Sequence, residues 1–528
     1  MGPGEDPDKY ILIDPIKGIN QFDWVRLPWI LQDEVGSSLI RRRLFYQIQA
    51  NYARTFGRHD ITATGVFTRE QQATGSEFQH YREDWVFRAT YNYEGKYFAE
   101  FNGAYNGSEK FGPRYRFGFF PSAAVGWTIS NEKFMKNLTW LNKLKLRYSY
   151  GLIGDDGISQ RWLYNTQWRY GLTSPLAEYA HPYNRSPYTW YTESVIGNPG
   201  IHWEKAKKSN LGLEMAVLKN MLSANVEYFT EDRTDILLVG PSRTLPAYFG
   251  GTPPTANVGR VKKKGYEVEL RFNKNLQNWL FWANTSVTHA IDKILYKEEP
   301  SLKDPHLLAQ GFQIDQTKTT IRDGFYNTWD EVYSGAQGAN NNNLKLPGDY
   351  KIIDFNGDGV IDYKDAAPYG YSIRPQNAFN FSLGADYKGF SLMLQFYGVN
   401  NVTRLVDFRD FMNNIDLVYP HALDYWTKDN PNASSFLPRW KTQGGQSTGD
   451  YFQFDGSYLR LKTAEIAYTF SGARLKQSVL SSLKVYLNGN NLLFWSKLPD
   501  DREQGFSGDV DGAYPTSRRI NLGVDIKF

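Results

Sequence analysis

Apolar and polar residues alternate along much of this 528-residue chain. The last stretch shows the pattern most clearly, because every second residue from 520 to 528 is apolar while the residues between them are Asn521, Gly523, Asp525 and Lys527. Successive side chains of a strand point to opposite faces, so this spacing predicts a strand with one apolar and one polar face. In a soluble sandwich the apolar face would point into a core, whereas in a transmembrane barrel it would point to lipid.

The same alternation recurs from residue 44 onwards and predicts roughly 14 to 16 strands. Hairpins are predicted where two copies flank a short turn, as at residues 94–96, 219–220 and 388–389. Many copies run to about ten residues, the length that a tilted strand needs to cross a bilayer. Further copies lie at 44–52, 61–67, 117–129, 144–150, 266–272, 281–287, 458–470 and 483–487, with a turn expected at 273–278.

The connections between these strands alternate between tight turns and long polar segments. The long ones lie at about 155–205, 293–374, 400–450 and 497–517. Short turns on one rim and long loops on the other are typical of an outer-membrane barrel. We therefore predict an all-β fold, a transmembrane antiparallel β-barrel, in which residues 1–528 form one barrel portion with long extracellular loops. The alternative is a large soluble β-sandwich or an array of them, which would have turns every 8 to 12 residues or so and lack such loops.

Composition agrees with a barrel. Aromatic residues make up 16% of the chain, although its mean hydropathy is only -0.54. This combination suits aromatic girdles around a polar lumen better than a buried core. No run of about 18 apolar residues is present, so no transmembrane helix is predicted. The formal net charge is +4 without a basic block, which disfavours nucleic-acid binding, and the absence of cysteine excludes disulfides and thiolate metal sites.

One segment carries the spacing of a calcium loop. The sequence D-F-N-G-D-G-V-I-D-Y-K-D places oxygen donors at positions 1, 3, 5, 7, 9 and 12, with Gly359 at the sharp bend. The candidate ligands are Asp354, Asn356, Asp358, the backbone carbonyl of Val360, Asp362 and Asp365. We predict a structural Ca²⁺ that pins a long loop. An Asx-rich turn without an ion is the alternative.

No catalytic arrangement is evident, so the chain is not predicted to be an enzyme. The seven histidines show no metal-binding spacing, and neither a G-x-S-x-G elbow nor a phosphate-binding glycine loop is present. A carboxylate pair of a glycoside hydrolase could lie among the acidic loop residues, but solvated loop charges are the commoner case. Loop aromatics could stack on sugars or pack their own loops. They are Trp162, Trp168, Tyr170, Trp190, Tyr191, Tyr326, Trp329, Tyr425 and Trp426.

Seven segments between about residue 80 and residue 528 carry distinctive sequence. They are F-G-P-R-Y-R-F-G-F-F-P-S-A-A-V-G-W (111–127), N-P-G-I-H-W-E-K (198–205), N-V-G-R-V-K-K-K-G-Y-E-V-E-L (257–270), P-G-D-Y-K-I-I-D-F-N-G-D-G-V-I-D (347–362), Y-L-R-L-K (458–462), V-Y-L-N-G-N-N-L-L-F-W (485–495) and the terminal strand. In these segments and in their order the chain resembles the SusC-like subfamily of TonB-dependent outer-membrane transporters of Bacteroidetes.

This resemblance implies a 22-stranded barrel in the outer membrane, a plug domain inside it, a SusD-like lipoprotein above it, and TonB as the energy-coupling partner. It implies import of oligosaccharides, or of peptides in some members, without chemistry on the substrate. The predicted strands fall short of 22, and no plug or TonB box is recognisable. We therefore expect an amino-terminal plug and barrel polypeptide to supply the rest, because an open sheet edge is costly in lipid.

Two other functions remain open from the sequence. One is a passive porin or structural barrel, and the other is a secreted, calcium-stabilised adhesin or glycan-binding β-protein that would be soluble without detergent. The terminal Phe528 also resembles the signal by which barrel proteins are recognised for insertion.

Overall fold

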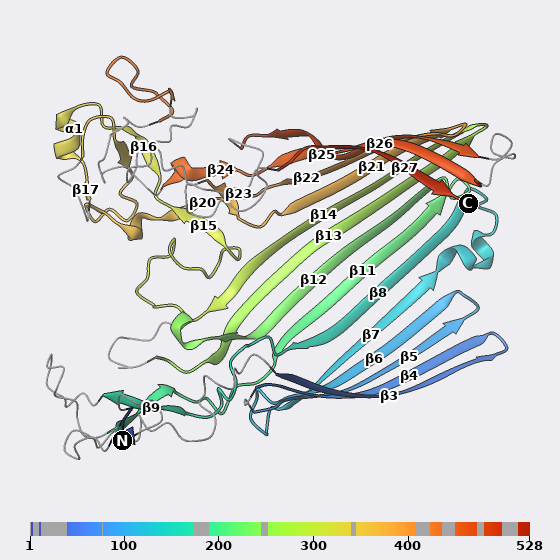
Figure 1. Cartoon of the computed structure of the whole chain (residues 1–528), viewed down its shortest axis with the longest axis horizontal. Helices are drawn as coiled ribbons and strands as arrows, with labels where there is room; N and C mark the ends of the chain where they lie inside the picture. The colour runs from blue at the N-terminus through green and yellow to red at the C-terminus, as the bar shows by residue number, and fades with distance from the viewer. Residues whose placement is uncertain are drawn as a thin grey trace.

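One large antiparallel sheet dominates the computed structural model of this chain (Figure 1). The structure describes residues 2–3, 10–11, 40–75, 78–173, 189–243, 252–338, 345–406, 423–435, 449–471, 480–498 and 516–528. The sheet has fifteen strands. They are β3 (Arg41–Phe56), β4 (His59–Thr74), β5 (His80–Tyr93), β6 (Tyr97–Ser108), β7 (Phe117–Thr128), β8 (Leu141–Asp155), β11 (Glu204–Val217), β12 (Leu222–Leu238), β13 (Ala256–Leu276), β14 (Trp279–Lys297), β21 (Asn377–Tyr387), β22 (Phe390–Asn400), β25 (Tyr458–Ser471), β26 (Ser482–Ser496) and β27 (Arg519–Lys527).

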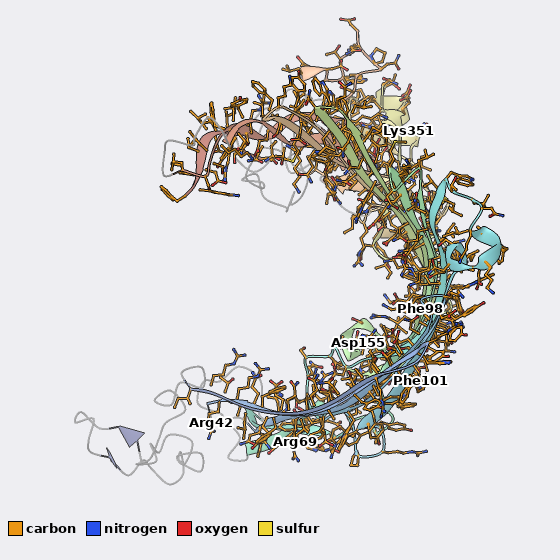
Figure 2. The ribbon with its side chains drawn as sticks, turned by 90° about the vertical axis from the view of Figure 1, so that its right-hand side faces the viewer. Arg42, Arg69, Phe98, Phe101, Asp155 and Lys351 are labelled. Atoms are coloured by element: carbon orange, nitrogen blue, oxygen red, sulfur yellow. The ribbon has the colours of Figure 1, made fainter. Side chains whose placement is uncertain are left out.

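The sheet is a simple meander. Each strand pairs with the large-sheet strand before it and the one after it in the chain, and β3 and β27 are its two edges. Viewed along the strands, the sheet curls into an open arc, and Asp155 lies on the hollow side of that arc (Figure 2). The sheet therefore has the shape of a long section of barrel wall.

The two ends of the strands differ. Tight turns join β3 to β4, β5 to β6, β11 to β12, β13 to β14 and β21 to β22 at the end where the carboxy terminus lies (Figure 1). Several of these turns use left-handed backbone, as at Glu94 and Gly95 with φ of 51° and 66°. Long connections leave the opposite end, at residues 156–203, 298–376, 401–457 and 497–518.

Small elements fill the described parts of these long connections. We call the described parts of residues 298–376 and 401–457 the loop layer. They include one short helix, α1 (Trp329–Ser334), capped by Thr328, whose side chain accepts a hydrogen bond from the backbone of Glu331. Two-stranded pairs make up the rest: β15 (Gln316–Thr319) with β20 (Ala367–Ser372), β16 (Arg322–Phe325) with β18 (Tyr350–Ile352), β17 (Gln337–Gly338) with β19 (Val360–Ile361), and β23 (Thr403–Leu405) with β24 (Gln453–Asp455). Outside the loop layer, β9 (Gln167–Thr173) pairs with β10 (Thr189–Val195), and β1 (Gly2–Pro3) with β2 (Tyr10–Ile11).

Buried apolar clusters lie mainly at the loop end. One contains Phe111, Phe120, Leu163, Ile201 and Trp203, and another contains Phe325, Tyr350, Trp426 and Ala433. In the described part of the sheet, by contrast, most large apolar side chains are exposed on one face. A sheet that leaves one apolar face uncovered is what a lipid-facing wall requires.

The predicted strands are confirmed, but the sequence underestimates their length. Residues 266–272 were expected as one strand, whereas β13 spans 21 residues. The turn expected at 273–278 is shorter than predicted: β13 continues to Leu276, Asn273 pairs with Trp282 across the hairpin, and the turn occupies only residues 277–278. Within the described residues, no helix is long and apolar enough to cross a membrane.

Candidate functional site

The hollow face of the sheet carries a network of charged and amide side chains. Lys143 and Arg147 on β8 contact Glu214 on β11 at 2.6 and 3.3 Å, and Arg147 also pairs with Glu227 on β12. Asn210 donates to the same Glu227 at 2.7 Å. Arg88 pairs with Glu100 at 2.8 Å on β5 and β6, at the same face. Oppositely charged groups thus neutralise one another while remaining in contact with water, as the lining of an aqueous passage would require.

The opposite face is apolar and aromatic over the middle of the strands. One cross-strand row contains Tyr148, Leu211, Tyr228, Tyr266 and His289, which are register partners on β8, β11, β12, β13 and β14. Tyr148, Leu211, Tyr228 and Tyr266 each expose 44 to 50% of their surface. Tyrosine is favoured at the boundary between lipid and water, because its ring is apolar and its hydroxyl is polar. This row therefore fits one girdle of a membrane-spanning barrel.

The predicted calcium loop is one compact turn in the loop layer. Both carboxylate oxygens of Asp354 accept backbone N–H groups, from Gly357 at 2.8 Å and Gly359 at 2.7 Å. Asp365 is fully buried and accepts from Phe355 at 2.8 Å and from Asp362 at 2.7 Å. The carboxylates thus hold the loop closed through hydrogen bonds to its own backbone.

Other predicted ligands lie nearer the surface of the same loop. Asp358 accepts from the backbone of Val360 and from the side chain of Asn356, and these hydrogen bonds hold the pKa of its carboxyl below the ordinary value. Lys364 approaches Asp358 and Asp362 at 3.8 and 3.7 Å. The donor set is all oxygen, which suits a hard cation. Over the described residues no group of three or more His, Asp or Glu side chains has metal-binding geometry, so the Ca²⁺ site stays a prediction.

A second polar feature of the loop layer is built around Arg322 on β16. Its guanidinium lies over the rings of Tyr350 and Tyr451, 5.0 and 5.4 Å from their centroids, and 3.4 Å from the carboxylate of Asp450. Burial raises the pKa of Asp450, while Arg322 acts in the opposite direction. The cluster joins residues far apart in sequence and fixes two long connections against each other.

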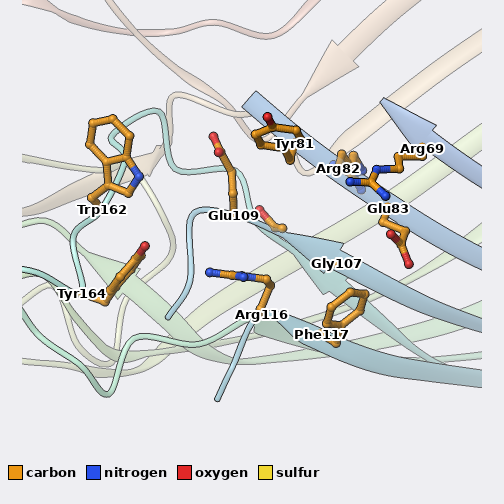
Figure 3. Close-up of a pocket in the computed structure, with 11 residues that line it drawn as sticks. Arg69, Tyr81, Arg82, Glu83, Gly107, Glu109, Arg116, Phe117, Trp162 and Tyr164 are labelled. Atoms are coloured by element: carbon orange, nitrogen blue, oxygen red, sulfur yellow. The ribbon is translucent and has the colours of Figure 1, made fainter. Parts of the chain in front are cut away.

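A pocket of about 400 Å³ lies at the loop end of β4 to β7 (Figure 3). Its floor is one register row, Arg69, Glu83, Gly107 and Phe117, on the aromatic outer face. Arg116, Glu109, Trp162 and Tyr164 enclose it from the connecting segments. Glu109 is already paired with Arg161 at 2.8 Å and with His80 at 3.1 Å. This pocket could not be predicted from the sequence, because only strand pairing brings residues 69, 83, 107 and 117 into one row.

The loop aromatics differ in their surroundings. Trp162 lines the pocket, whereas Tyr326 and Trp426 are buried, and the Trp426 indole donates to the side chain of Asn327 at 2.9 Å. Trp329 is half exposed and stacks on Tyr333. Trp168 and Tyr425 are exposed. The side chains of Tyr170, Trp190 and Tyr191 lie outside the described residues, as do His181 and His421.

The chain is similar in sequence to curated proteins that share one description. The chain is 29% identical over 472 residues to TonB-dependent receptor P26 of Formosa agariphila and 24% identical over 461 residues to TonB-dependent receptor SusC of Bacteroides thetaiotaomicron, in both cases over 84% of this chain. The chain is thus a homologue of proteins named TonB-dependent receptors. No family model matches it.

Solved structures agree with this fold. The chain superposes on the RagAB peptide transporter with a TM-score of 0.70 and 20% identity, over 92% of this chain and 56% of that one. The RagAB peptide importer in the closed-closed state gives a TM-score of 0.69 and 21% identity. The chain spans about half the length of the curated relatives that it matches, covering 45% of P26 and 43% of SusC.

The fold and the sequence similarity together confirm three of the predictions. The chain has an all-β fold of the outer-membrane barrel type, it belongs in the cell outer membrane, and its homologues are receptors and transporters, not enzymes. Its apolar outer face and charged hollow face fit that location.

Proposed function

We propose that this chain forms most of the wall of a TonB-dependent importer that moves oligosaccharides or peptides across the outer membrane. The observation that carries the proposal is the two-faced meander: fifteen paired strands, an apolar outer face, and a hollow face lined by ion pairs such as Arg147 with Glu214. Relatives named TonB-dependent receptors support the energy source, and structures titled as a peptide importer support import. No bond of the substrate is made or broken.

The proposal includes a second polypeptide segment that completes the barrel. In the described part of the chain, β3 and β27 have only one sheet partner each, and unpaired backbone groups are costly in lipid. A 22-stranded barrel, as the resemblance implies, needs seven strands beyond these fifteen, by subtraction. An amino-terminal plug and barrel portion would pair with both edges and carry the contact with TonB.

A SusD-like surface lipoprotein is the other proposed partner. The loop layer stands at the end away from the tight turns, and its packed clusters around Phe325 and Arg322 give it a defined surface. Support comes from the match to SusC and to the two-component name RagAB. We leave the substrate open between an oligosaccharide, which the family resemblance implies, and a peptide, which the titles of the RagAB structures name.

Purification from native outer membranes tests this function. The chain is tagged, extracted in mild detergent, and all co-purifying proteins are identified by mass spectrometry. We expect a plug-bearing polypeptide and a SusD-like lipoprotein in stoichiometric amounts. Recovery of this chain alone in a soluble, monomeric form would contradict the proposal and favour a secreted adhesin.

Uptake measurements separate active import from a passive porin. Cells with and without the gene are supplied with labelled oligosaccharides and peptides, in the presence and absence of a protonophore. Gene-dependent uptake that the protonophore abolishes is expected. Uptake that persists without the proton-motive force would contradict TonB coupling and indicate a pore.

A further inference from the structure

Basic side chains gather on the outer face of the barrel wall just above the aromatic row. Three successive register rows cross β8, β11, β12, β13 and β14 on this face, each two residues apart along a strand. The first is the girdle row from Tyr148 to His289. The second contains Tyr150, Ser209, Thr230, Lys264 and Ile291, and the third contains Leu152, Lys207, Asp232, Lys262 and Lys293.

The outward direction of these rows follows from strand alternation and from contacts. Tyr228 and Tyr266 are half exposed on the lipid-facing side, and Thr230, Lys264, Asp232 and Lys262 follow at intervals of two residues. Ser209 and Thr230 share a hydrogen bond of 3.0 Å between their hydroxyls. The intervening residues Lys208 and Lys263 lie on the hollow side, where Lys208 pairs with Glu231 at 3.3 Å and Lys263 lies over the Phe229 ring at 5.9 Å.

Cations outnumber anions in this surface, which we call the basic patch. It contains Lys205, Lys207, Arg260, Lys262, Lys264 and Lys293. Arg260 pairs with Asp232 at 2.6 Å, and Lys205 lies 3.5 Å from Asp235. Within the described ranges, Lys207, Lys262, Lys264 and Lys293 form no ion pair and are all exposed. Asp232 lies between Lys207 and Lys262 in the third row and interacts electrostatically with both, but it already forms an ion pair with Arg260. The patch therefore keeps an excess of positive charge that faces the surroundings.

The position of the patch matters as much as its charge. It lies toward the loop end of strands β11 to β14, immediately beyond the tyrosines that fit the membrane boundary. One step of two residues along a tilted strand rises by about 5 Å, so the patch begins roughly 5 to 10 Å above the girdle. This is the depth of lipid headgroups in the outer leaflet.

Another row of the outer face, nearer the loop end of β4 and β5, has a different arrangement. There Arg69 lies directly opposite Glu83, so that opposite charges face each other. The basic patch on β11 to β14 differs from this row in its excess of positive charge.

We propose that the basic patch binds the phosphate groups of outer-leaflet lipids, holding a phosphorylated headgroup against the barrel wall. Ammonium groups attract phosphate as point charges, and the hydroxyls of Ser209 and Thr230 add hydrogen-bond donors between them. The acyl chains of the same lipid would continue onto the apolar face below Tyr228 and Tyr266, so one molecule meets both surfaces. The proposal rests on the outer-membrane location and does not depend on the imported substrate.

Matched lysine variants test the proposal in the intact complex purified from native outer membranes. The outer variant, Lys207→Gln with Lys262→Gln, removes two patch charges; the control, Lys208→Gln with Lys263→Gln, removes two charges one residue away on the hollow face. Phosphorylated lipid retained per complex after a detergent wash is measured by mass spectrometry. We expect at least a fivefold loss in the outer variant, wild-type retention in the control, and recovery with Lys207→Arg and Lys262→Arg.

Two further arms identify the ligand. The delipidated complex is offered detergent-solubilised outer-leaflet lipid that is intact or enzymatically dephosphorylated, and inorganic phosphate is added as a competitor. Binding of intact lipid alone, displaced only by a large excess of phosphate, supports a headgroup site. Equal retention by the outer variant and wild type, equal loss in both double variants, or equal binding of the dephosphorylated lipid would overturn the proposal, as would displacement by phosphate at equimolar concentration. Substrate uptake that stays normal in the outer variant separates this result from the import function.

Discussion

At the scale of single residues, the carboxylates of the loop around Asp354 perform two tasks. Asp354 and Asp365 accept backbone N–H groups and so determine the shape of the loop, while every candidate ligand atom in it is an oxygen. Each carboxylate oxygen has two lone pairs, so an oxygen that accepts one hydrogen bond can still contact a cation. Hydrogen bonding to the backbone and Ca²⁺ binding are therefore compatible in this loop.

Chelation should loosen this loop if it holds Ca²⁺. We expect EGTA to increase tryptic cleavage after Lys364 several-fold in the purified complex, because loss of the ion leaves adjacent carboxylates to repel one another. Asp354→Asn should be cleaved rapidly with or without EGTA. Asp323→Asn, an acidic residue of the same layer that pairs with Lys351 at 3.5 Å, is the control and should behave as wild type. Cleavage that ignores EGTA in wild type would indicate a turn that needs no ion.

The lowered pKa of Asp358 gives the loop a pH dependence. A depressed carboxyl pKa adds stability that is complete above the ordinary value of 3.8 and is lost as the pH falls through the lower folded value. Hydrogen exchange at Gly359 and Val360, corrected for intrinsic rates, should be slower in wild type than in Asp358→Asn from pH 7 to about pH 4. The difference should then shrink on further acidification. A constant difference across this range would show that the Asp358 charge does not stabilise the loop.

At the scale of elements, close strand contacts make particular glycines necessary. A Cβ added at Gly265 on β13 would lie 2.1 Å from the backbone oxygen of His289 on β14, so the two strands would have to separate. The same addition at Gly65 on β4 meets nothing within 4 Å. Strand pairing in the middle of the wall thus depends on the residue at position 265.

Alanine substitutions at Gly265 and Gly65 should differ in their effect on the stability of the barrel. Gly265→Ala is expected to destabilise the barrel by about 1–3 kcal/mol, the usual range for overpacking. The readout is the temperature at which the folded form disappears in a gel-shift assay. Gly65→Ala is the matched control and should melt within a degree or so of wild type, since strand interiors gain slightly from replacing glycine. Equal melting of both variants would mean that β13 and β14 can shift without cost.

We expect the carboxy-terminal strand β27 to be required for assembly of the barrel into the outer membrane. Ile526 pairs with Leu483, and the backbone of Ser481 donates to the carbonyl of Lys527 at 2.7 Å. Deleting residues 526–528 should abolish assembly into the outer membrane, measured as loss of the heat-modifiable form in membrane fractions. Phe528→Tyr keeps the aromatic end and should assemble normally. Full insertion of the truncated chain would refute this role of β27.

At the scale of the whole molecule, the meander keeps all pairing in the large sheet local. Every strand contacts the large-sheet strands before and after it in the chain, and no strand crosses over another. The ladder therefore depends on hydrogen bonds between neighbours and not on the covalent continuity of a long loop.

Cleavage of one long loop should leave the large sheet assembled. A protease site inserted at Leu302, which is 97% exposed in the connection from β14 to β21, allows cleavage after membrane assembly. We expect the nicked protein to keep its heat-modifiable form, with both fragments co-purifying. A second site placed at Thr285 inside β14 is the control and should resist cleavage. Dissociation of the fragments after cleavage at 302 would show that the loop itself holds the strands together.

Strand positions and faces could be predicted from the sequence, because lipid on one side and water on the other impose an alternation that each strand shows by itself. The ends of the strands could not be predicted in this way. Around Lys262 and Lys264 polar residues occupy both faces, so the alternation stops while the hydrogen-bond ladder of β13 continues. The pocket near Arg69 was missed for another reason: its floor exists only in the register of four strands.

The length of β13 has a consequence for how a solute reaches the passage. Its 21 residues extend about 70 Å, or roughly 50 Å along the membrane normal at a tilt near 40°, against about 30 Å of hydrocarbon. The wall on this side of the molecule thus rises well clear of the lipid before the loop layer begins. In the importer that we propose, a solute arriving from the medium would therefore meet the entrance about 20 Å beyond the hydrocarbon of the bilayer.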